Sequence, residues 1–507
     1  MNLDQWTPVV VGVGQAAERI DDPGYRGMSP VELAAAAARA AVQDCGAAAA
    51  AAAIDTVAGV RQFEISGVIN APLGRSNNYP RSVANRLGAN PARAILEIVG
   101  GQGPQHLISE LAAEIAAGRS EVAMVFGSDA TSTLRYFARA EAKPDFTETV
   151  DGDLEDRGQG IEKLVSRYTV SHGLTNAPVQ YALLENARRA GTGLGPAEYR
   201  RQMGELFAPF TKVAASNPFA AAPVERTVDE LITVTERNRM ISEPYPRLLV
   251  SRDQVNQGAA ALLMSVAAAR RLGVPEENWV YLHGHADTEE QSLLERPDLG
   301  HAPSAVMAVR DALTMAGIGI DDIATFDLYS CFPVPVFNIC DGMGIATDDP
   351  RGLTRTGGLP FFGGAGNNYS MHAVAETVAE MRSAPGQFGL VGANGGVLSK
   401  YSVGIYSTTP VEWKPDRSAQ LQAQVANWPT QSVTEDAAGD ATIETYTVRR
   451  DGGAPTGIII GRLAADDSRF LANTEDEELI ALLIDGEPLG RKVRVRSFDY
   501  GNRCFLR

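Results

Sequence analysis

Two glycine-rich stretches decide the fold of this chain: Gly100-Gly101-Gln102-Gly103-Pro104 and Gly363-Gly364-Ala365-Gly366-Asn367. Each opens an amphipathic helical pattern of similar length, which is followed by a buried apolar strand pattern, VAMVF in the first segment and FGLVG in the second. Repetition at a distance of about 263 positions predicts a duplicated domain with two equivalent helix N-termini. Because free backbone N–H groups and the positive dipole end gather there, both N-termini are candidate sites for an oxyanion or a thioester.

The composition predicts a globular protein with more than one domain. A chain of 507 residues is long for a single core, and apolar and charged fractions of 44% and 21% are ordinary. The net charge of −17 argues against nucleic acid as the main partner, because neutralising phosphates needs a basic surface.

The cysteines and the apolar runs predict a cytoplasmic protein without a membrane segment. No CxxC pair occurs among the four cysteines, so neither a zinc site nor a disulfide framework is expected. The start, MNLDQWTPVVVGVG, lacks a basic region followed by an apolar signal core. No apolar run approaches the length that crosses a bilayer.

Strand and helix patterns alternate along most of the chain. Strands are expected at 8–14, 121–127, 280–285, 325–329 and 403–407, and helices at 31–44, 258–271 and 303–316. Such alternation, with near-continuous apolar strands, predicts an α/β layered fold with sheets covered on both faces.

Shifts in composition divide the chain into five regions. We expect an N-terminal half over 1–130, a loop and helical insertion over 131–250, a C-terminal half over 251–410, a polar linker over 411–440 and a small all-β domain over 441–507. The last region alternates apolar and polar residues, as in ETYTV and KVRVRSF, which is typical of strands.

Two further motifs resemble the thiolase superfamily, and within it the sterol-carrier-protein-type thiolases. ISEPYPRLLVSRDQVNQGAAALLMSVAAARRLG resembles the family's segment leading into its Gly-Ala-Ala-Ala stretch, and Tyr329-Ser330-Cys331-Phe332 stands where the family carries HDCF. The resemblance covers roughly residues 6–408, and the whole layout is most similar to the actinobacterial type-1 thiolase-like proteins. It implies a thiolase fold, a duplicated βαβαβαββ unit in five αβαβα layers, with a helical insertion and a small C-terminal all-β (OB-like) domain.

Most of the family's catalytic residues are replaced at the matching positions of this sequence. The nucleophilic Cys falls on Gly101 (or Gly100), the His of the GHP loop on Gly364, the first two residues of HDCF on Tyr329 and Ser330, and the late Cys on Ala393. Without a thiol nucleophile no acyl-enzyme can form, so thiolase activity is expected to be absent.

Three residues are candidate catalytic groups: Tyr329, Cys331 and His372. A phenol at 329 can act as acid or base only through a shifted pKa or a hydrogen-bonded partner. Cys331 is the acid/base group that the resemblance implies, and a lone Cys beside Phe and Pro is also a common core residue. His372 is the one histidine near the expected centre, either as a base or as a buried structural group.

The ligand-binding candidates lie mostly on the two glycine turns. Gly101, Gly103 and Gly364 are expected to leave an open cavity for a thioester carbonyl, and Asn367 and Asn368 either cap the second helix or donate hydrogen bonds into that cavity. Arg135 is a candidate partner for coenzyme A phosphates. No metal site and no tightly bound cofactor are expected.

These features predict a protein that binds an acyl-CoA thioester and has lost thiolase activity. One alternative is a carbon–carbon lyase that cleaves a β-hydroxyacyl-CoA with Tyr329, and another is a scaffold that acts through its C-terminal domain. A homodimer and a monomer both stay open.

The C-terminal region also carries a basic run, Arg491-Lys492-Val493-Arg494-Val495-Arg496. Its alternation places the basic residues mostly on one strand face. OB-like domains bind single-stranded nucleic acid, but solvated charge is the simpler interpretation, so no nucleic-acid partner is expected.

Overall fold

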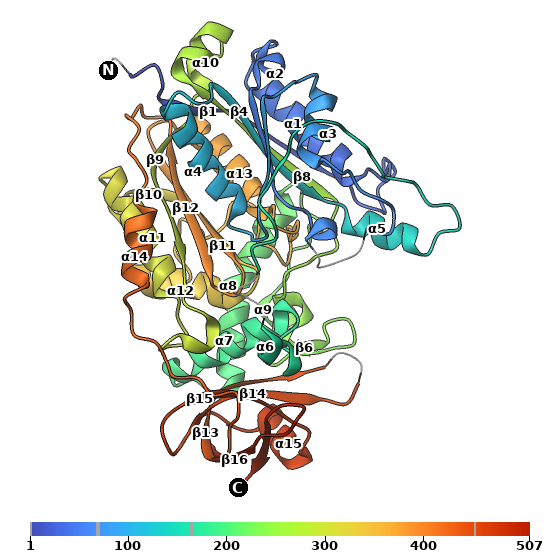
Figure 1. The fold of residues 1–507 in the computed structure, drawn as a ribbon, viewed down its shortest axis with the longest axis vertical. Coiled ribbons are helices and arrows are strands. Elements are labelled where there is room, and N and C mark those ends of the chain that lie inside the picture. The colour runs from blue at the N-terminus through green and yellow to red at the C-terminus, as the bar shows by residue number, and fades with distance from the viewer. Residues whose placement is uncertain (1–2, 67–70, 162–165, 451–452) are drawn as a thin grey trace.

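The computed structural model describes residues 3–66, 71–161, 166–450 and 453–507. Its main body has five layers, in which three helical layers alternate with two sheets, and a separate β-barrel lies at the C-terminal end (Figure 1). The α/β fold class and the small all-β region are therefore confirmed. Among the described residues, no helix has the length and apolar content that crossing a bilayer requires.

The first sheet has six strands in the order β1-β8-β4-β2-β3-β5. Their bounds are Pro8–Ala17, Gln257–Ser265, Val122–Asp129, Thr56–Gly59, Arg93–Leu96 and Glu155–Asp156. Strand β8 runs antiparallel between β1 and β4, while β4, β2 and β3 are parallel. Every residue of β4 and β8 is buried, because helices cover both faces of this sheet.

The outer face of this sheet is covered by α1 (Pro30–Asp44), which packs on β1, β8 and β4. The helix begins at Ser29, whose hydroxyl accepts a hydrogen bond from the backbone N–H of Glu32 in a capping box, with Pro30 in the first turn. The helix predicted over 31–44 is thus confirmed. Two further helices lie on this side, α2 (Ala50–Ala53) and α3 (Tyr79–Leu87).

The second sheet has four strands in the order β10-β11-β12-β9, with bounds Ile323–Leu328, Phe388–Gly395, Lys400–Ser407 and Tyr281–Glu289. Helix α11 (Pro303–Ala316) packs on β9 and β12 and matches the prediction. Helix α12 (Pro333–Met343) follows β10 and contacts α11.

The two repeated helices form the middle layer between the sheets. They are α4 (Gly103–Ala116) and α13 (Tyr369–Ser383), which contact each other and the strands of both sheets. The duplication read from the glycine turns is therefore built into the centre of the molecule, with the two helix N-termini on the same side of the sheets (Figure 1).

Helices and short strands of the segment between β5 and β8 lie between the layered body and the barrel (Figure 1). These elements are α6 (Arg167–Ser171), α7 (Ala177–Thr192), α8 (Pro196–Ser216), α9 (Val228–Ile232), β6 (Met240–Ser242) and β7 (Tyr245–Pro246). Helix α5 (Thr131–Ala138) comes earlier in the chain and directly follows β4. Strand β6 pairs with the barrel strand β13 (Gly439–Arg449), so this segment extends the barrel sheet.

The barrel closes five strands in the order β13-β14-β15-β17-β16, with β13 also pairing to β14 and β16. The other bounds are β14 Thr456–Leu463, β15 Arg469–Thr474, β16 Lys492–Arg496 and β17 Arg503–Leu506, with helix α15 (Glu477–Asp485) between β15 and β16. Its interior is a small core of its own, including Ile443, Ile459, Phe470 and Val495.

Two sequence-based expectations differ from the structure. The helix predicted over 258–271 is wrong for most of its length, because residues 257–265 form β8 and only Val266–Leu272 are helical, as α10. Since β8 belongs to the first sheet, these residues lie with the N-terminal half. The segment expected as a linker carries α14 (Ser418–Val425), which packs against β9 and α11.

Candidate functional site

The first glycine turn is closed by a tyrosine. A Cβ atom added to Gly101 would lie 2.2 Å from the Tyr329 hydroxyl oxygen and 2.6 Å from the backbone oxygen of Asn394. Non-bonded carbon and oxygen atoms do not approach so closely, so the Tyr329 hydroxyl occupies the space that a side chain at 101 would need. The position that the resemblance gives to a nucleophile is therefore filled by the phenol.

The second glycine turn is closed in the same way by a serine. A Cβ atom added to Gly364 would lie 2.2 Å from the Ser251 hydroxyl oxygen. The expectation that both glycine turns leave an open cavity is wrong, because Tyr329 and Ser251 occupy the two spaces. Gly103, in the first turn of α4, is buried with only the Glu97 side chain near its missing Cβ.

Asn367 holds the two halves together. Its Oδ1 accepts a hydrogen bond from the backbone N–H of Gly100 at 3.0 Å, and its Nδ2 donates to the backbone oxygen of Arg61 at 2.7 Å. Ser370 adds a hydrogen bond from its hydroxyl to the backbone oxygen of Gly101 at 2.6 Å. The Asn367 amide is thus engaged on both sides by backbone.

Asn368 precedes α13 but does not cap it. Its side chain is buried, its Oδ1 lies against Gly127, and among the described residues neither its nitrogen nor its oxygen has a hydrogen-bond partner. A buried amide without partners is costly, which marks this position as one where a polar atom of a ligand or a water would be stabilised.

His372 is a neutral core residue. Its Nδ1 lies 2.7 Å from Oε1 of Gln15, and its ring packs edge-on against Phe362 at 5.0 Å between centroids. Burial lowers the pKa of His372 to about 3. At neutral pH it carries no charge, and the contacts of the described residues do not bring it to Tyr329 or Cys331.

Tyr329 and Cys331 lie together in the core, each under one-tenth exposed. Burial, and then the neighbouring Cys331, raises the pKa of Tyr329, and burial raises the pKa of Cys331 to about 12. Both groups therefore keep their protons at neutral pH. Among the described residues none hydrogen-bonds to the Tyr329 hydroxyl, so nothing in this part of the chain prepares it to act as a base.

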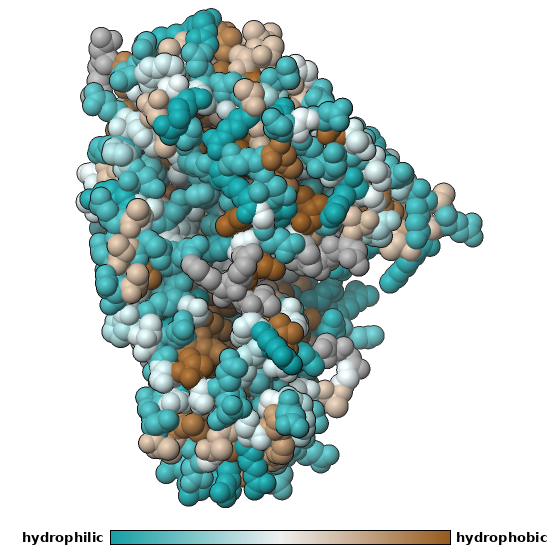
Figure 2. Space-filling view, in the orientation of Figure 1, coloured by the Kyte–Doolittle hydropathy of each residue, from teal (hydrophilic) through white to brown (hydrophobic). Residues whose placement is uncertain are grey.

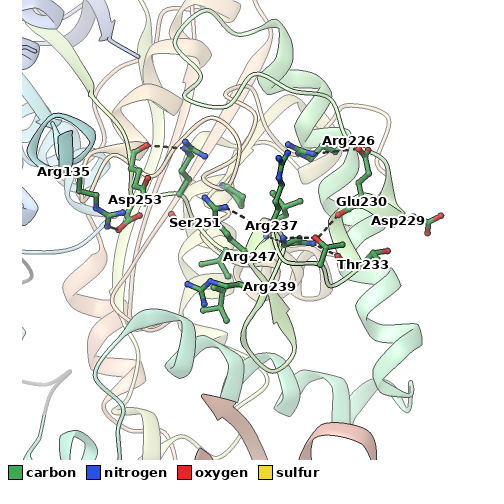
Figure 3. Close-up of a pocket in the computed structure, with 18 residues that line it drawn as sticks. Arg135, Arg226, Asp229, Glu230, Thr233, Arg237, Arg239, Arg247, Ser251 and Asp253 are labelled. Atoms are coloured by element: carbon green, nitrogen blue, oxygen red, sulfur yellow. Dashed lines mark hydrogen bonds and ion pairs between the residues drawn. The ribbon is translucent and has the colours of Figure 1, made fainter. Parts of the chain in front are cut away.

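A cleft rich in arginine is the second feature of this region (Figure 3). It has a volume of about 850 Å³ and is lined by six arginines against three carboxylates: Arg135, Arg226, Arg237, Arg239, Arg247, Arg252, Asp229, Glu230 and Asp253. In a chain of net charge −17 this local excess of positive charge stands out.

The arginines of the cleft differ in their partners. Arg135, which the sequence singled out, forms an ion pair with Asp253 at 2.6 Å, and Arg226 lies 4.0 Å from Glu230. Arg237 and Arg239 are exposed, and their side chains make no ion pair with the described residues. Figure 3 shows them, with Arg247, at the centre of the cleft.

Burial, and then the charge of Arg247, lowers the pKa of Arg252. An anion bound in the cleft would relieve this repulsion between the two guanidinium groups.

Backbone hydrogen bonds connect the cleft to the centre. The N–H of Ser251, a cleft residue, donates to the backbone oxygen of Cys331 at 2.9 Å, and the N–H of Arg252 donates to the oxygen of Leu359 at 3.1 Å. The Ser251 side chain faces Gly364. Ser251, which lines the cleft, is therefore in direct contact with the segment that carries Tyr329 and Cys331.

Glu64 and Asp129 form a buried acidic pair beside the second glycine turn. Burial raises the pKa of Glu64 to about 7 against the opposing charge of Arg75, and burial and the charge of Glu64 raise that of Asp129. The Asp129 carboxylate lies against the backbone of Gly366, so the pair is where the two halves meet.

This pair predicts a loss of stability with rising pH. The folded pKa of Glu64 lies above its ordinary value of 4.5, so ionising it costs free energy that is absent below pH 4.5 and complete above about pH 7. Raising the pH from 5 to 8 should lower the free energy of unfolding less in the Glu64→Gln variant than in the unmodified protein. The difference between the two decreases should be at most about 3 kcal/mol. Urea titrations at the two pH values measure this, with the exposed Glu475→Gln as control; equal losses in all three proteins would contradict it.

A cluster of Glu97, His106 and Glu110 has atoms close enough to hold a metal ion, but its charges are already paired. Arg157 contacts Glu97 at 2.7 Å and Glu110 at 2.6 Å. Burial lowers the pKa of His106, but Asp287 at 2.8 Å outweighs it and raises the pKa to about 9. A protonated imidazole is no ligand, so no metal is assigned to this cluster.

Sequence reasoning missed most of the cleft. Only Arg135 was singled out, while Arg237, Arg239 and Arg247 lie in an irregular segment around β6 and β7 with no motif spacing. The one available signal was their density, since four arginines fall between positions 226 and 247.

The comparisons with known proteins agree with this architecture. Residues 420–499 match the family model of the thiolase-like protein type 1 additional C-terminal domain. A monomeric SCP2-thiolase like protein type 1 (STLP1) from Mycobacterium smegmatis is 57% identical, covers 100% of both chains and superposes with a TM-score of 0.87. No curated protein matches the chain.

Two more distant structures share the fold. One is an Ltp2-ChsH2(DUF35) aldolase, 18% identical with a TM-score of 0.58, which covers 79% of this chain and 98% of its own. The other is an acetyl-CoA acetyltransferase from Syntrophomonas wolfei, 14% identical with a TM-score of 0.55, covering 80% of this chain and 99% of its own.

Proposed function

Because the chain belongs to the family of SCP2-thiolase-like proteins type 1, we propose that it binds a coenzyme A thioester and leaves the thioester intact. The binding part of the proposal rests on the arginine cleft, which has the size of an ordinary ligand site and an excess of positive charge. Coenzyme A carries a diphosphate and a further phosphate, and guanidinium groups bind such oxygens with paired, charge-assisted hydrogen bonds.

The absence of thiolase chemistry rests on the two closed glycine turns. A thiolase needs a thiolate that takes up the acyl group and an acid or base that moves protons. Here the position that the resemblance gives to the nucleophile is Gly101, with the Tyr329 phenol against it, and the position that it gives to the His is Gly364, with Ser251 against it. Cys331 keeps its proton and lies buried, so it does not replace the missing thiolate.

The same observations argue against a lyase that uses Tyr329 as a base. Removing a proton from a β-hydroxyl group needs a phenolate or a base coupled to the phenol. Burial raises the pKa of Tyr329, and no described residue hydrogen-bonds to its hydroxyl. Binding without chemistry is the function that the geometry supports best.

Calorimetric titration with coenzyme A and acetyl-CoA tests the binding. The Arg237→Ala/Arg239→Ala variant should bind both ligands at least about tenfold more weakly, because each removed guanidinium takes a charge-assisted contact with it. The matched control is Arg270→Ala/Arg271→Ala on α10, which removes two exposed arginines outside the cleft. Equal affinities in the three proteins, or no heat with the unmodified protein, would overturn the proposal.

A further inference from the structure

The C-terminal barrel has the strand arrangement of an oligonucleotide-binding fold. Its five strands close in the order β13-β14-β15-β17-β16, with β15 parallel to β17 and helix α15 between the third and fourth strands. Such barrels bind oligonucleotides through the face of their second and third strands and through the loops that join strands one and two and strands four and five. Here the last of these is the loop between β16 and β17.

The face of the second and third strands is not available in this chain. Ile458, Ile460 and Leu471 on β14 and β15 belong to the main hydrophobic core together with Leu183 and Leu184 of α7. The Thr445 hydroxyl on β13 also donates to the backbone oxygen of Leu183. Any ligand of the barrel must therefore use the strands on its other side.

The outer face of β16 and β17 is that free side, and it is basic. Along β16, Val493 and Val495 point into the barrel while Lys492, Arg494 and Arg496 are exposed. The strand register places Arg503 of β17 opposite Arg496. On the neighbouring strand β13 the one carboxylate in register is Asp440, opposite Arg494, and it already lies 3.3 Å from Arg507.

The loop between β16 and β17 adds two exposed aromatic rings. Phe498 is 39% exposed and Tyr500 is 61% exposed, and both count among the few large apolar side chains on the described surface. The two rings stack at 5.3 Å between centroids with 12° between their planes. The Arg503 guanidinium lies 4.6 Å from the centre of the Tyr500 ring, which joins the aromatic pair to the basic face.

Strand β16 lies at the end of the molecule farthest from the layered body (Figure 1), where hydrophilic residues dominate the surface shown (Figure 2). The loop after it reaches α6, where the N–H of Asn502 donates to Nε2 of His172 at 3.0 Å. A row of cations beside a flat aromatic pair has the two parts that single-stranded nucleic acid requires, because phosphates need positive charge and unpaired bases need a ring to stack on. An acidic peptide would use the cations but not the rings.

We propose that the outer face of β16 and β17, with the loop between them, binds single-stranded nucleic acid. Lys492, Arg494 and Arg496 contact successive phosphates, and a base stacks on the pair formed by Phe498 and Tyr500. The net charge of −17 repels the strand from the molecule as a whole, so binding depends on the basic surfaces and falls steeply with salt. This site is separate from the arginine cleft and does not depend on the proposed function.

Fluorescence anisotropy of a labelled mixed-sequence single-stranded oligonucleotide, titrated with the full-length protein, tests the proposal. The Arg494→Glu/Arg496→Glu variant should bind at least about tenfold more weakly and show a smaller salt dependence, because two phosphate contacts are lost. Tyr500→Ala should weaken binding about fivefold or more through lost stacking, with an unchanged salt dependence. The matched control, Arg270→Glu/Arg271→Glu on α10, makes the same charge change at the opposite end of the molecule (Figure 1).

Competition separates this partner from other anions. Unlabelled oligonucleotide should displace the probe, whereas poly-glutamate and vesicles with anionic lipid should not do so at equal charge. The proposal is overturned if Tyr500→Ala and Arg494→Glu/Arg496→Glu bind like the unmodified protein, or if poly-glutamate competes as well as the oligonucleotide. It is also overturned if Arg237→Ala/Arg239→Ala abolishes binding, since the probe would then lie in the cleft.

Discussion

Replacing Gly101 with alanine is expected to destabilise the protein by about 1–3 kcal/mol, although glycine-to-alanine changes near helices usually stabilise. The added methyl group would lie 2.2 Å from the Tyr329 hydroxyl and 2.5 Å from its ring carbon Cζ, so the tyrosine must move in a densely packed core. For the same reason, Gly101→Cys should not restore thiolase activity. The free energy of unfolding from urea titrations measures the effect.

A second variant shows whether Tyr329 causes the loss. Tyr329→Ala removes the obstructing phenol. Gly101→Ala should therefore lower the free energy of unfolding clearly less in the Tyr329→Ala variant than in the unmodified protein. Such non-additivity is expected of residues in contact. The control is Gly191→Ala in α7, where no atom lies within 4 Å of the missing Cβ, and a small gain in stability is expected. If Gly101→Ala is as harmless as Gly191→Ala, Tyr329 does not close the turn.

Replacing Arg469 with alanine is expected to cost about 3 kcal/mol or more, because it leaves several buried backbone carbonyls without their donor and leaves Glu444 with Arg462 alone. The Arg469 side chain is fully buried and lies 2.7 Å from Glu444. It also donates to the backbone oxygens of Leu294 and Arg296 in the layered body. One arginine of β15 thus joins the barrel to the rest of the molecule.

Arg462→Ala is the matched control, since Arg462 contacts the same Glu444 at 2.8 Å from a partly exposed position. It should cost about 1 kcal/mol or less, because Arg469 still neutralises the carboxylate. Thermal unfolding and limited proteolysis report both effects, and we expect Arg469→Ala alone to expose the segment between β12 and β13 to cleavage. Equal stability of the two variants would contradict this role of Arg469.

The layered fold was largely predictable because its signals are local. The repeated glycine turns, the helix over 31–44 and the apolar strands depend on residues close together in the sequence, and each lies where the pattern placed it. The segment around β8 was misread because strands covered on both faces show no alternation, and a run such as GAAALLMS fits a buried helix equally well. Its pairing with β1 and β4, far away in sequence, decides the outcome.

The candidate site was less predictable because it depends on contacts between distant residues. The sequence shows that Gly101 and Gly364 lack side chains, but not that Tyr329 and Ser251 occupy the space. Likewise, Arg237 and Arg239 have no spacing that signals a site, and only the turn through β6 and β7 brings them to the cleft with Arg135. The alternation of apolar and polar residues predicted the strands of the barrel, while its closure was implied by the resemblance alone and helix α15 was not predicted.

Native mass spectrometry of the protein with acetoacetyl-CoA tests the central claim most directly, because one spectrum reports binding and the mass of the ligand. We expect a one-to-one complex that releases acetoacetyl-CoA of unchanged mass, and no acyl group left on the protein after denaturation. The complex should be lost in Arg237→Ala/Arg239→Ala. A covalent acyl adduct, acetyl-CoA formed on adding coenzyme A, or no complex at all would contradict the account.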